Sequence, residues 1–270
     1  MSRPRAAIVA SGSELVRGDR NDRNGPFLAA ELLRLGIEPA RITIVGDGEA
    51  DLEQALREGL DFDLLCVSGG LGPTHDDRTI ELLARAAGVP LVLDEELRQG
   101  IEALSRRVAE RLRRPYTDFA PGVSKQATLP EGALWTGLVG TAPAVILEVA
   151  GCVAVALPGP PSELQAHWPL VLQTEPLQAL LARASAPERR PFRFYGVSES
   201  AVAQALAAAG GDGNGVEVTI CARETEIHLD MFVEDGAAAR ADELSAQPAL
   251  LAAYGAAFTP SDDVTLVVIA

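Results

Sequence analysis

The sequence is poor in basic and aromatic residues. Its 270 residues include 23 Lys and Arg against 38 Asp and Glu, a formal net charge of −15, and aromatic side chains make up 4% of the chain. Surfaces that bind nucleic acid or anionic membranes need clustered Lys and Arg. The charge balance therefore argues against both partners. Because 47% of the residues are hydrophobic, a full core is still expected, built mostly from alanine, leucine and valine.

The chain also lacks paired cysteines and a long apolar run. Cys66, Cys152 and Cys221 are far apart in the sequence, and each lies in an apolar stretch. No pair has the spacing of a metal site, and reduced, buried thiols are the simplest interpretation. No apolar segment is long enough to span a bilayer. Residues 1–5 are basic but lead into a short strand-like run, not a signal-peptide core. We therefore expect a soluble, cytoplasmic protein.

Short apolar runs and amphipathic stretches alternate in the first part of the chain. The runs at 6–10, 37–45 and 63–68 predict buried strands, and the stretches between them predict helices. This alternation is typical of a parallel, doubly wound α/β sheet. Ligands of such sheets bind beyond the carboxyl ends of the strands, so we expect the turns that follow these strands to surround one pocket.

The composition changes near residue 183. Residues 183–191 are polar and form the best linker candidate, between a first domain over 1–182 and a second over 192–270. The second predicts a small α+β domain, because alternating strand-like segments are flanked by an Ala-rich helix and a further helix. Residues 210–213 match the GxxG pattern of nucleic-acid-binding KH loops. Without flanking Lys or Arg, we interpret them as a turn.

The most distinctive stretch is SGGLGPTHDDRT, residues 68–79. Three glycines lie between a predicted strand and a predicted helix, where the backbone bends sharply or approaches a ligand. A helix start after such a turn favours phosphate binding. Asp76 and Asp77 would repel an anion there unless a divalent cation or a proton lay between them, and magnesium-type ions prefer carboxylate and phosphate oxygens. The stretch therefore predicts a metal-assisted phosphate site.

Each candidate residue also has a purely structural interpretation. Asp76 and Asp77 could cap a helix, Asp47 could be an ordinary turn residue, and Lys125 could be an exposed surface side chain. Two adjacent carboxylates behind a glycine turn favour the functional interpretation, and so does the place of Asp47 at a strand end. For Lys125 and Glu14 the two interpretations are balanced.

Four blocks in the same order resemble the CinA family, within the wider fold of molybdopterin-binding proteins. The blocks are residues 11–18 with 22–24, residues 68–79, residues 125–127 and 129–133 with 140–143, and residues 157–164. The region after 192 resembles the KH-like domain of that family. The resemblance implies a mostly parallel sheet flanked by helices, followed by a small α+β KH-like domain, and a homodimer.

The resemblance implies metal-dependent hydrolysis of the pyrophosphate of ADP-ribose or a related nucleotide, giving AMP and ribose 5-phosphate. The implied ion is magnesium, manganese or cobalt, with potassium as an optional second ion. The wider fold implies instead a molybdopterin-binding module, with or without nucleotidyl transfer, and a catalytically silent interaction protein is a third hypothesis. Long CinA proteins carry a further domain that deamidates nicotinamide mononucleotide. Because this sequence stops where that domain would begin, we do not expect that activity.

The resemblance and the strand-end turns together define the predicted site. Its catalytic and metal-binding residues are Asp47, Asp76 and Asp77, of which Asp77 matches the carboxylate kept across the wider fold. The expected ligand is a small phosphorylated molecule, nucleotide-like or pterin. The predicted substrate-binding residues are Ser11, Gly12, Glu14, Asn24, Ser68, Gly69, Gly70, Gly72, Pro73, Thr74, Thr79, Lys125, Thr141, Pro158, Gly159, Pro160, Ser162 and Glu163.

Overall fold

The computed structural model describes residues 3–140, 142–195, 197–223 and 226–245. The chain divides into two compact units, Met1–Ala184 and Ser185–Ala270. Strand β9 begins at Glu188, so the second half of the predicted linker is a strand and not a loop. Its polar residues misled the prediction because they pair with acidic partners: Arg189 with Asp230 and Arg190 with Asp242.

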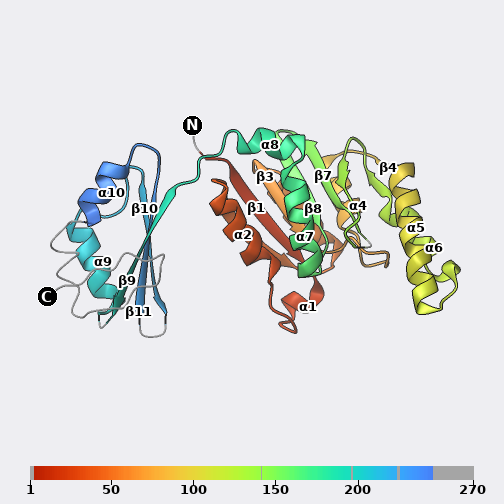
Figure 1. Ribbon diagram of the computed structural model, residues 1–270, viewed down its shortest axis with the longest axis horizontal. Helices are drawn as coiled ribbons and strands as arrows, with labels where there is room; N and C mark the ends of the chain where they lie inside the picture. The colour runs from red at the N-terminus through yellow and green to blue at the C-terminus, as the bar shows by residue number, and fades with distance from the viewer. Residues whose placement is uncertain (1–2, 141, 196, 224–225, 246–270) are drawn as a thin grey trace. The chain divides into compact units, whose positions relative to one another are not determined.

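The first unit is built on a six-stranded sheet with the order β2-β1-β3-β8-β7-β6 (Figure 1). The four strands from β2 to β8 are parallel, and β7 pairs antiparallel with both of its neighbours. The central strands are continuous apolar runs because helices cover both faces of the sheet. The strands are β1 (Arg5–Ser11), β2 (Glu38–Val45), β3 (Leu64–Ser68), β6 (Leu134–Thr136), β7 (Ala144–Val149) and β8 (Cys152–Leu157).

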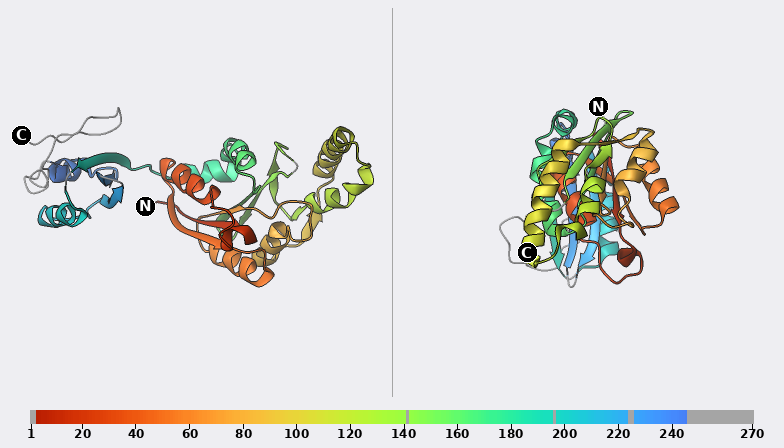
Figure 2. Two further views of the ribbon diagram at one scale, coloured as in Figure 1. Left: turned by 90° about the horizontal axis from the view of Figure 1, so that it is seen from below. Right: turned by 90° about the vertical axis from the view of Figure 1, so that its right-hand side faces the viewer.

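Two helix layers sandwich this sheet, as Figure 2 shows for α2 above and α3 below in its left view. One core joins Ala6 and Ile8 of β1 to α2 (Asn24–Arg34), α7 (Pro161–Leu172) and α8 (Glu175–Leu181). The other core joins Ala7 and Val9 to the opposite layer. That layer contains α3 (Glu49–Gly59), α4 (Thr79–Ala87), α5 (Glu95–Leu112) and α6 (Ala120–Gln126). The predicted mostly parallel α/β fold is confirmed.

Short elements complete the first unit. The helix α1 (Ser13–Val16) follows β1, and β4 (Leu91–Leu93) pairs with β5 (Thr128–Pro130) as a separate two-stranded sheet. The segment after α5, whose proline and glycine residues are typical of a loop, contains the turn η1 (Tyr116–Asp118) and the helix α6. Lys125 therefore comes from a helix. The sequence does not predict this helix, because α6 contains Pro121 and Gly122, residues that usually mark loops.

The second unit is a three-stranded antiparallel sheet with the order β10-β11-β9. Its core contains Phe192, Phe194, Leu229 and Met231. Residues 210–213 form a turn before β10. The apolar, strand-like run at 264–270 lies outside the described residues. The elements are β9 (Glu188–Tyr195), α9 (Glu199–Ala208), β10 (Val216–Arg223), β11 (Glu226–Val233) and α10 (Ala238–Ser245).

The cysteines differ in exposure. Cys66 and Cys152 are buried, and burial raises the pKa of the Cys152 thiol to about 12. Cys221 is exposed, so the expectation of three buried thiols is wrong. It follows Ile220 on β10, whose side chain packs on the core, and therefore points to the opposite face of the strand. Among the described residues, no helix is long and apolar enough to cross a membrane.

Candidate functional site

The turn after β3 lies directly against the backbone of neighbouring segments. Gly69 and Gly70 have φ values of +106° and +68°. A Cβ atom on Gly69 would overlap with the Ser11 carbonyl oxygen, and one on Gly70 would overlap with the Thr79 side chain. The Thr79 hydroxyl donates a hydrogen bond of 2.8 Å to the Gly69 carbonyl. Glycine is therefore required at both positions. The hydrogen bond from Thr79 fixes the conformation of the turn.

Two carboxylates of the motif face one hydroxyl group. Asp76 Oδ1 lies 2.5 Å from Thr74 Oγ1, and Asp77 Oδ2 contacts the same oxygen while accepting the Thr74 backbone N–H at 2.9 Å. The Thr74 hydroxyl bond is the main reason that the pKa of Asp76 lies below its ordinary value. A hydroxyl has one proton, so it satisfies one of the two carboxylates at a time. The other oxygen is left for a cation or a ligand proton.

Helix α6 holds this turn from the other side. Lys125 Nζ donates to the Thr74 carbonyl, and Gln126 Nε2 donates to the Leu71 carbonyl at 3.0 Å. Burial lowers the pKa of Lys125 below its ordinary value, although the nearby charges of Asp77 and Asp76 act in the opposite direction. Lys125 thus holds its charge close to both carboxylates, where it would meet an anionic ligand.

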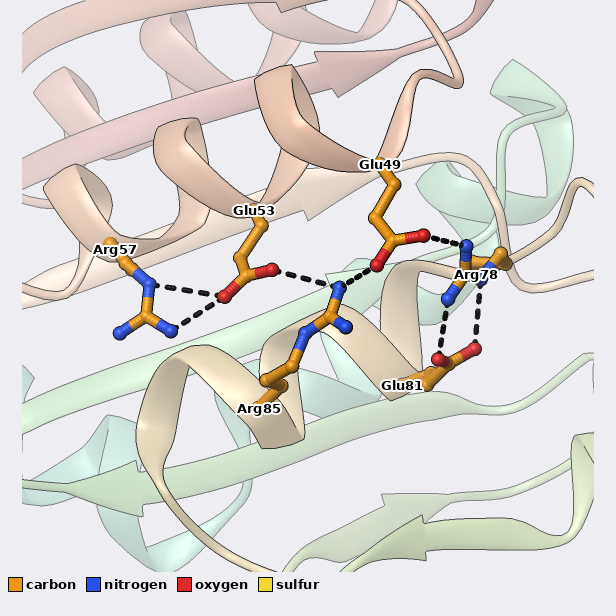
Figure 3. A network of polar contacts seen from close by, with 6 residues as sticks. All are labelled: Glu49, Glu53, Arg57, Arg78, Glu81 and Arg85. Atoms are coloured by element: carbon orange, nitrogen blue, oxygen red, sulfur yellow. Dashed lines mark hydrogen bonds and ion pairs between the residues drawn. The ribbon is translucent and has the colours of Figure 1, made fainter.

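The start of α4 is fixed by a network of ion pairs with α3 (Figure 3). Arg78, which follows Asp77, pairs with Glu49 of α3 and with Glu81 of its own helix. About two turns further along α4, Arg85 pairs with Glu49 and Glu53. These contacts link the helix that follows the glycine turn to the helix that follows β2, and so hold Asp77 at the strand ends.

Two hollows open on either side of the glycine turn. The smaller, of 280 Å³, is lined on its polar side by Gly70, Gly72, Asp77 and Lys125. The larger, of 660 Å³, is within the usual size range of small-ligand pockets. The predicted residues that line the larger hollow are Ser11, Glu14, Asn24, Ser68, Gly159 and Pro160. The single pocket expected from the sequence is therefore divided between two hollows.

The floor of the larger hollow contains polar atoms without partners. Asn24 Nδ2 donates to Ser68 Oγ at 2.7 Å and to the Gly159 carbonyl at 2.8 Å. Because a carbonyl only accepts, these bonds fix the orientation of the amide and leave Oδ1 facing away. Within the described residues, Asn24 Oδ1 and Ser11 Oγ are buried and have no hydrogen-bond partner. A buried unpaired polar atom costs about 1–3 kcal/mol, which a bound ligand would recover.

Asp47 is engaged elsewhere. Its Oδ2 accepts hydrogen bonds from the backbone N–H of Ser13 at 3.0 Å and from the Ser13 hydroxyl at 2.6 Å. These bonds join the turns after β2 and β1. The described residues contain no group of three or more His, Cys, Asp or Glu able to hold a metal ion. The predicted set of Asp47, Asp76 and Asp77 is therefore not assembled, because Asp47 is held by the start of α1. Metal dependence itself stays a prediction.

Several other residues predicted for the site make structural contacts or lie away from the two hollows. Glu163 lies beside Gly140 in a separate hollow against α5, where burial raises the pKa of its carboxyl. Its assignment to the main site is therefore corrected: the first turn of α7 directs it away. Pro158 is buried and Ser162 is exposed. Pro73 packs closely on Gly122 of α6, and Gly12 donates its N–H to the Val45 carbonyl. Thr141 lies outside the described residues.

Sequence reasoning missed part of the larger hollow. Arg20, Asn21, Asp22 and Arg23 line it together with Leu15. A signal was present in the sequence, because residues 17–23 contain three arginines in a chain dominated by acidic residues. This loop reaches the hollow only through the short helix α1.

The fold and this strand-end site define a molybdopterin-binding type of domain. The family model described as "Probable molybdopterin binding domain" matches residues 7–178. A solved structure of the protein CinA, of unknown function, from Thermoplasma acidophilum is 30% identical, with a TM-score of 0.54. The match covers 64% of this chain and 96% of that one.

The similarity to curated relatives extends beyond the first unit into the second. CinA-like proteins of Mycobacterium marinum and Mycobacterium tuberculosis are each 40% identical over 247 residues, 87% of this chain. The match covers 57% and 56% of those proteins, so the chain spans about half the length of the curated relatives it matches. The chain belongs to the CinA-like family, and the family resemblance predicted from the four sequence blocks is confirmed.

Proposed function

We propose that the first unit binds a small phosphorylated heterocycle, of the pterin or nucleotide kind, at the carboxyl ends of β1, β3 and β8. The observation that carries this proposal is the pair of unpartnered buried atoms, Ser11 Oγ and Asn24 Oδ1, in the larger hollow. A ligand with adjacent N–H or O–H donors and acceptors would satisfy both atoms. The family model supports a pterin as the first choice.

Calorimetric titration with a phosphorylated pterin and with ADP-ribose tests this proposal. We expect the pterin to bind more tightly. Ser11→Ala should weaken binding by about tenfold without lowering stability, because the hydroxyl has no partner in the free protein. Ser124→Ala, at an exposed position of α6, is the matched control and should bind like the wild type. Absence of binding to both ligands would contradict the proposal and favour an interaction protein without ligand.

A second candidate is metal-dependent hydrolysis of the pyrophosphate of ADP-ribose or a related nucleotide. It is favoured by the two carboxylates that share the Thr74 hydroxyl. Asp76 and Asp77 suit a magnesium-type ion, which takes one or two carboxylates and completes its shell with phosphate oxygens and water. When bound, such an ion supplies charge neutralisation and a water of lowered pKa. Lys125 would hold the phosphate against the turn.

This candidate predicts release of AMP and ribose 5-phosphate from ADP-ribose in the presence of magnesium, manganese or cobalt, with or without potassium. Asp77→Asn should reduce the rate by at least about 100-fold. Asp47→Asn should mainly lower stability, because Asp47 bonds to Ser13. If no metal supports turnover while the pterin binds, the hydrolase candidate is wrong and the binding proposal stands. The homodimer and the cytoplasmic location stay predictions.

A further inference from the structure

Three arginines of one loop have no acidic partner. In the part of the chain that the structure describes, no ion pair or side-chain hydrogen bond involves Arg17, Arg20 or Arg23. The helices behave differently: Arg85 and Arg98, for example, each pair with two glutamates. In a chain with 38 acidic and 23 basic residues, residues 17–23 carry three guanidinium groups against the two carboxylates of Asp19 and Asp22, a local net charge of +1.

The backbone of this loop is tied down at both ends. The N–H groups of Asp19 and Arg20 donate to the Glu14 carbonyl at 2.9 and 3.2 Å. Asp22 accepts the N–H groups of Asn24 and Gly25 at 2.9 and 3.0 Å, which caps the start of α2. Asp22 therefore uses its carboxylate at the helix N-terminus and, within the described residues, forms no ion pair with the arginines.

Two of the three arginines belong to the larger hollow. Arg20 and Arg23 line it with Ser11 and Asn24, whereas Arg17 is not one of its lining residues. The two arginines are exposed and the two polar residues are buried. Glu14 also lines this hollow, and its carboxylate folds back against Gly12. The hollow thus has two exposed guanidinium groups that form no ion pair among the described residues, next to the carboxylates of Glu14 and Asp22. It also has two buried side chains with an unpaired oxygen, Ser11 and Asn24.

We propose that Arg20 and Arg23 bind the phosphate group of the ligand at the rim of the larger hollow, while its uncharged end reaches Ser11 and Asn24. Guanidinium groups bind phosphate through paired, charge-assisted hydrogen bonds. Asn24 Oδ1 needs a donor, which a phosphate dianion cannot provide, so the phosphate faces outward. This inference rests on the proposed function and adds the orientation of the ligand and the residues that select its phosphorylated form.

The test compares phosphorylated and dephosphorylated forms of two probes, a pterin monophosphate with its pterin and AMP with adenosine. Calorimetric titration of Arg20→Gln, Arg23→Gln and the double variant should show about tenfold weaker binding of the phosphorylated form for each arginine removed. Binding of the dephosphorylated form should change by less than about twofold. Arg17→Gln is the matched control, because it removes the same charge from the same loop outside the hollow.

Each result decides the matter. Equal losses for both forms of a probe, or a loss with Arg17→Gln as large as with Arg20→Gln, would overturn direct phosphate recognition. If the wild type binds and the double variant binds as tightly, this inference fails and the proposed function stands. If the wild type binds neither phosphorylated probe, both fail. Trp135 and Trp168 both lie in the first unit, so tryptophan fluorescence reports its unfolding on heating. The same unfolding midpoint in a variant and in the wild type would show that the variant folds normally.

Discussion

Asn24 donates a hydrogen bond of 2.8 Å from its side-chain amide to the carbonyl of Gly159, a residue 135 positions away in the chain. The same amide group donates to Ser68. One side chain at the start of α2 therefore joins the end of β3 to the turn after β8, and its remaining oxygen is buried without a hydrogen-bond partner. The bond couples the stability of the first unit to the shape of its larger hollow.

Asn24→Asp should strongly destabilise the first unit. The substitution places a carboxylate oxygen against the Gly159 carbonyl and buries a charge, and we expect a loss of about 3 kcal/mol in the free energy of unfolding. Urea unfolding followed by tryptophan fluorescence measures it. Asn21→Asp, at an exposed position of the same loop, should stay within about 0.5 kcal/mol of the wild type. Equal stability of the two variants would contradict the role of the Asn24 amide.

Gly69→Ala should cost about 3 kcal/mol or more of unfolding free energy, because the backbone is left-handed and the added methyl group overlaps with the Ser11 carbonyl. Gly88→Ala is its control. Gly88 also has a positive φ, of +71°, but a Cβ atom there meets nothing within 4 Å. Its cost should be about 1–2 kcal/mol, from the backbone conformation alone. The difference between the two variants in urea unfolding isolates the close approach of the turn to β1.

Arg85→Gln should lower the thermal midpoint of the first unit slightly at low ionic strength. Arg85 joins Glu49 and Glu53 of α3 (Figure 3), but the pairs are solvent-exposed and salt screens them. The difference from the wild type should disappear in about 1 M NaCl. Arg107→Gln on α5 removes an exposed arginine that has no ion pair among the described residues. A salt-independent loss confined to Arg85→Gln would mean that packing, and not charge, holds α3 and α4 together.

The stability of the first unit should fall as the pH falls from about 7.5 to 5.5. Burial lowers the pKa of His167 below its ordinary value of 6.5, so the unfolded chain binds a proton in this range before the folded chain does. His167 keeps its contacts, 3.2 Å each to Thr136 Oγ1 and the Ala142 carbonyl, as a neutral ring. Glu163, whose pKa is raised by burial, acts with the opposite sign at lower pH.

The variant His167→Gln tests whether His167 causes this dependence of stability on pH. The variant should flatten the dependence of the urea midpoint on pH between 7.5 and 5.5, although its absolute stability will be lower, because it removes the buried titrating group. His75→Gln, at an exposed position, controls for the removal of a histidine. An unchanged slope in His167→Gln would assign the pH dependence to another group.

Thiol reagents should distinguish the three cysteines. Cys221 is exposed and should react in the native protein, whereas Cys66 and Cys152 are buried and should react only after unfolding. The measurement is the number of thiols that react with and without denaturant. Cys221→Ser should remove the native-state reaction. Reaction of Cys66 or Cys152 in the folded variant would show that the core opens on the time scale of the assay.

Much of the fold followed from local patterns. The run Ala6–Ala10 is apolar on both sides because helices cover both faces of its strand, and Gly88 ends α4 where the αL conformation is needed. Segments with mixed signals were predicted less well. Helix α6 was hidden by Pro121 and Gly122, and the start of β9 was hidden by charges whose partners lie on β11 and α10.

The sequence by itself determined the α/β alternation, the need for glycine after β3 and the family, because these depend on residues close together in the chain. Only the tertiary structure decided which turns share a hollow. It paired Asp47 with Ser13, left Asn24 Oδ1 and Ser11 Oγ without partners, and placed Arg20 and Arg23 at the rim. The reason is physical: a side chain's hydrogen-bond partners come from segments brought together by packing, and spacing along the chain does not specify them.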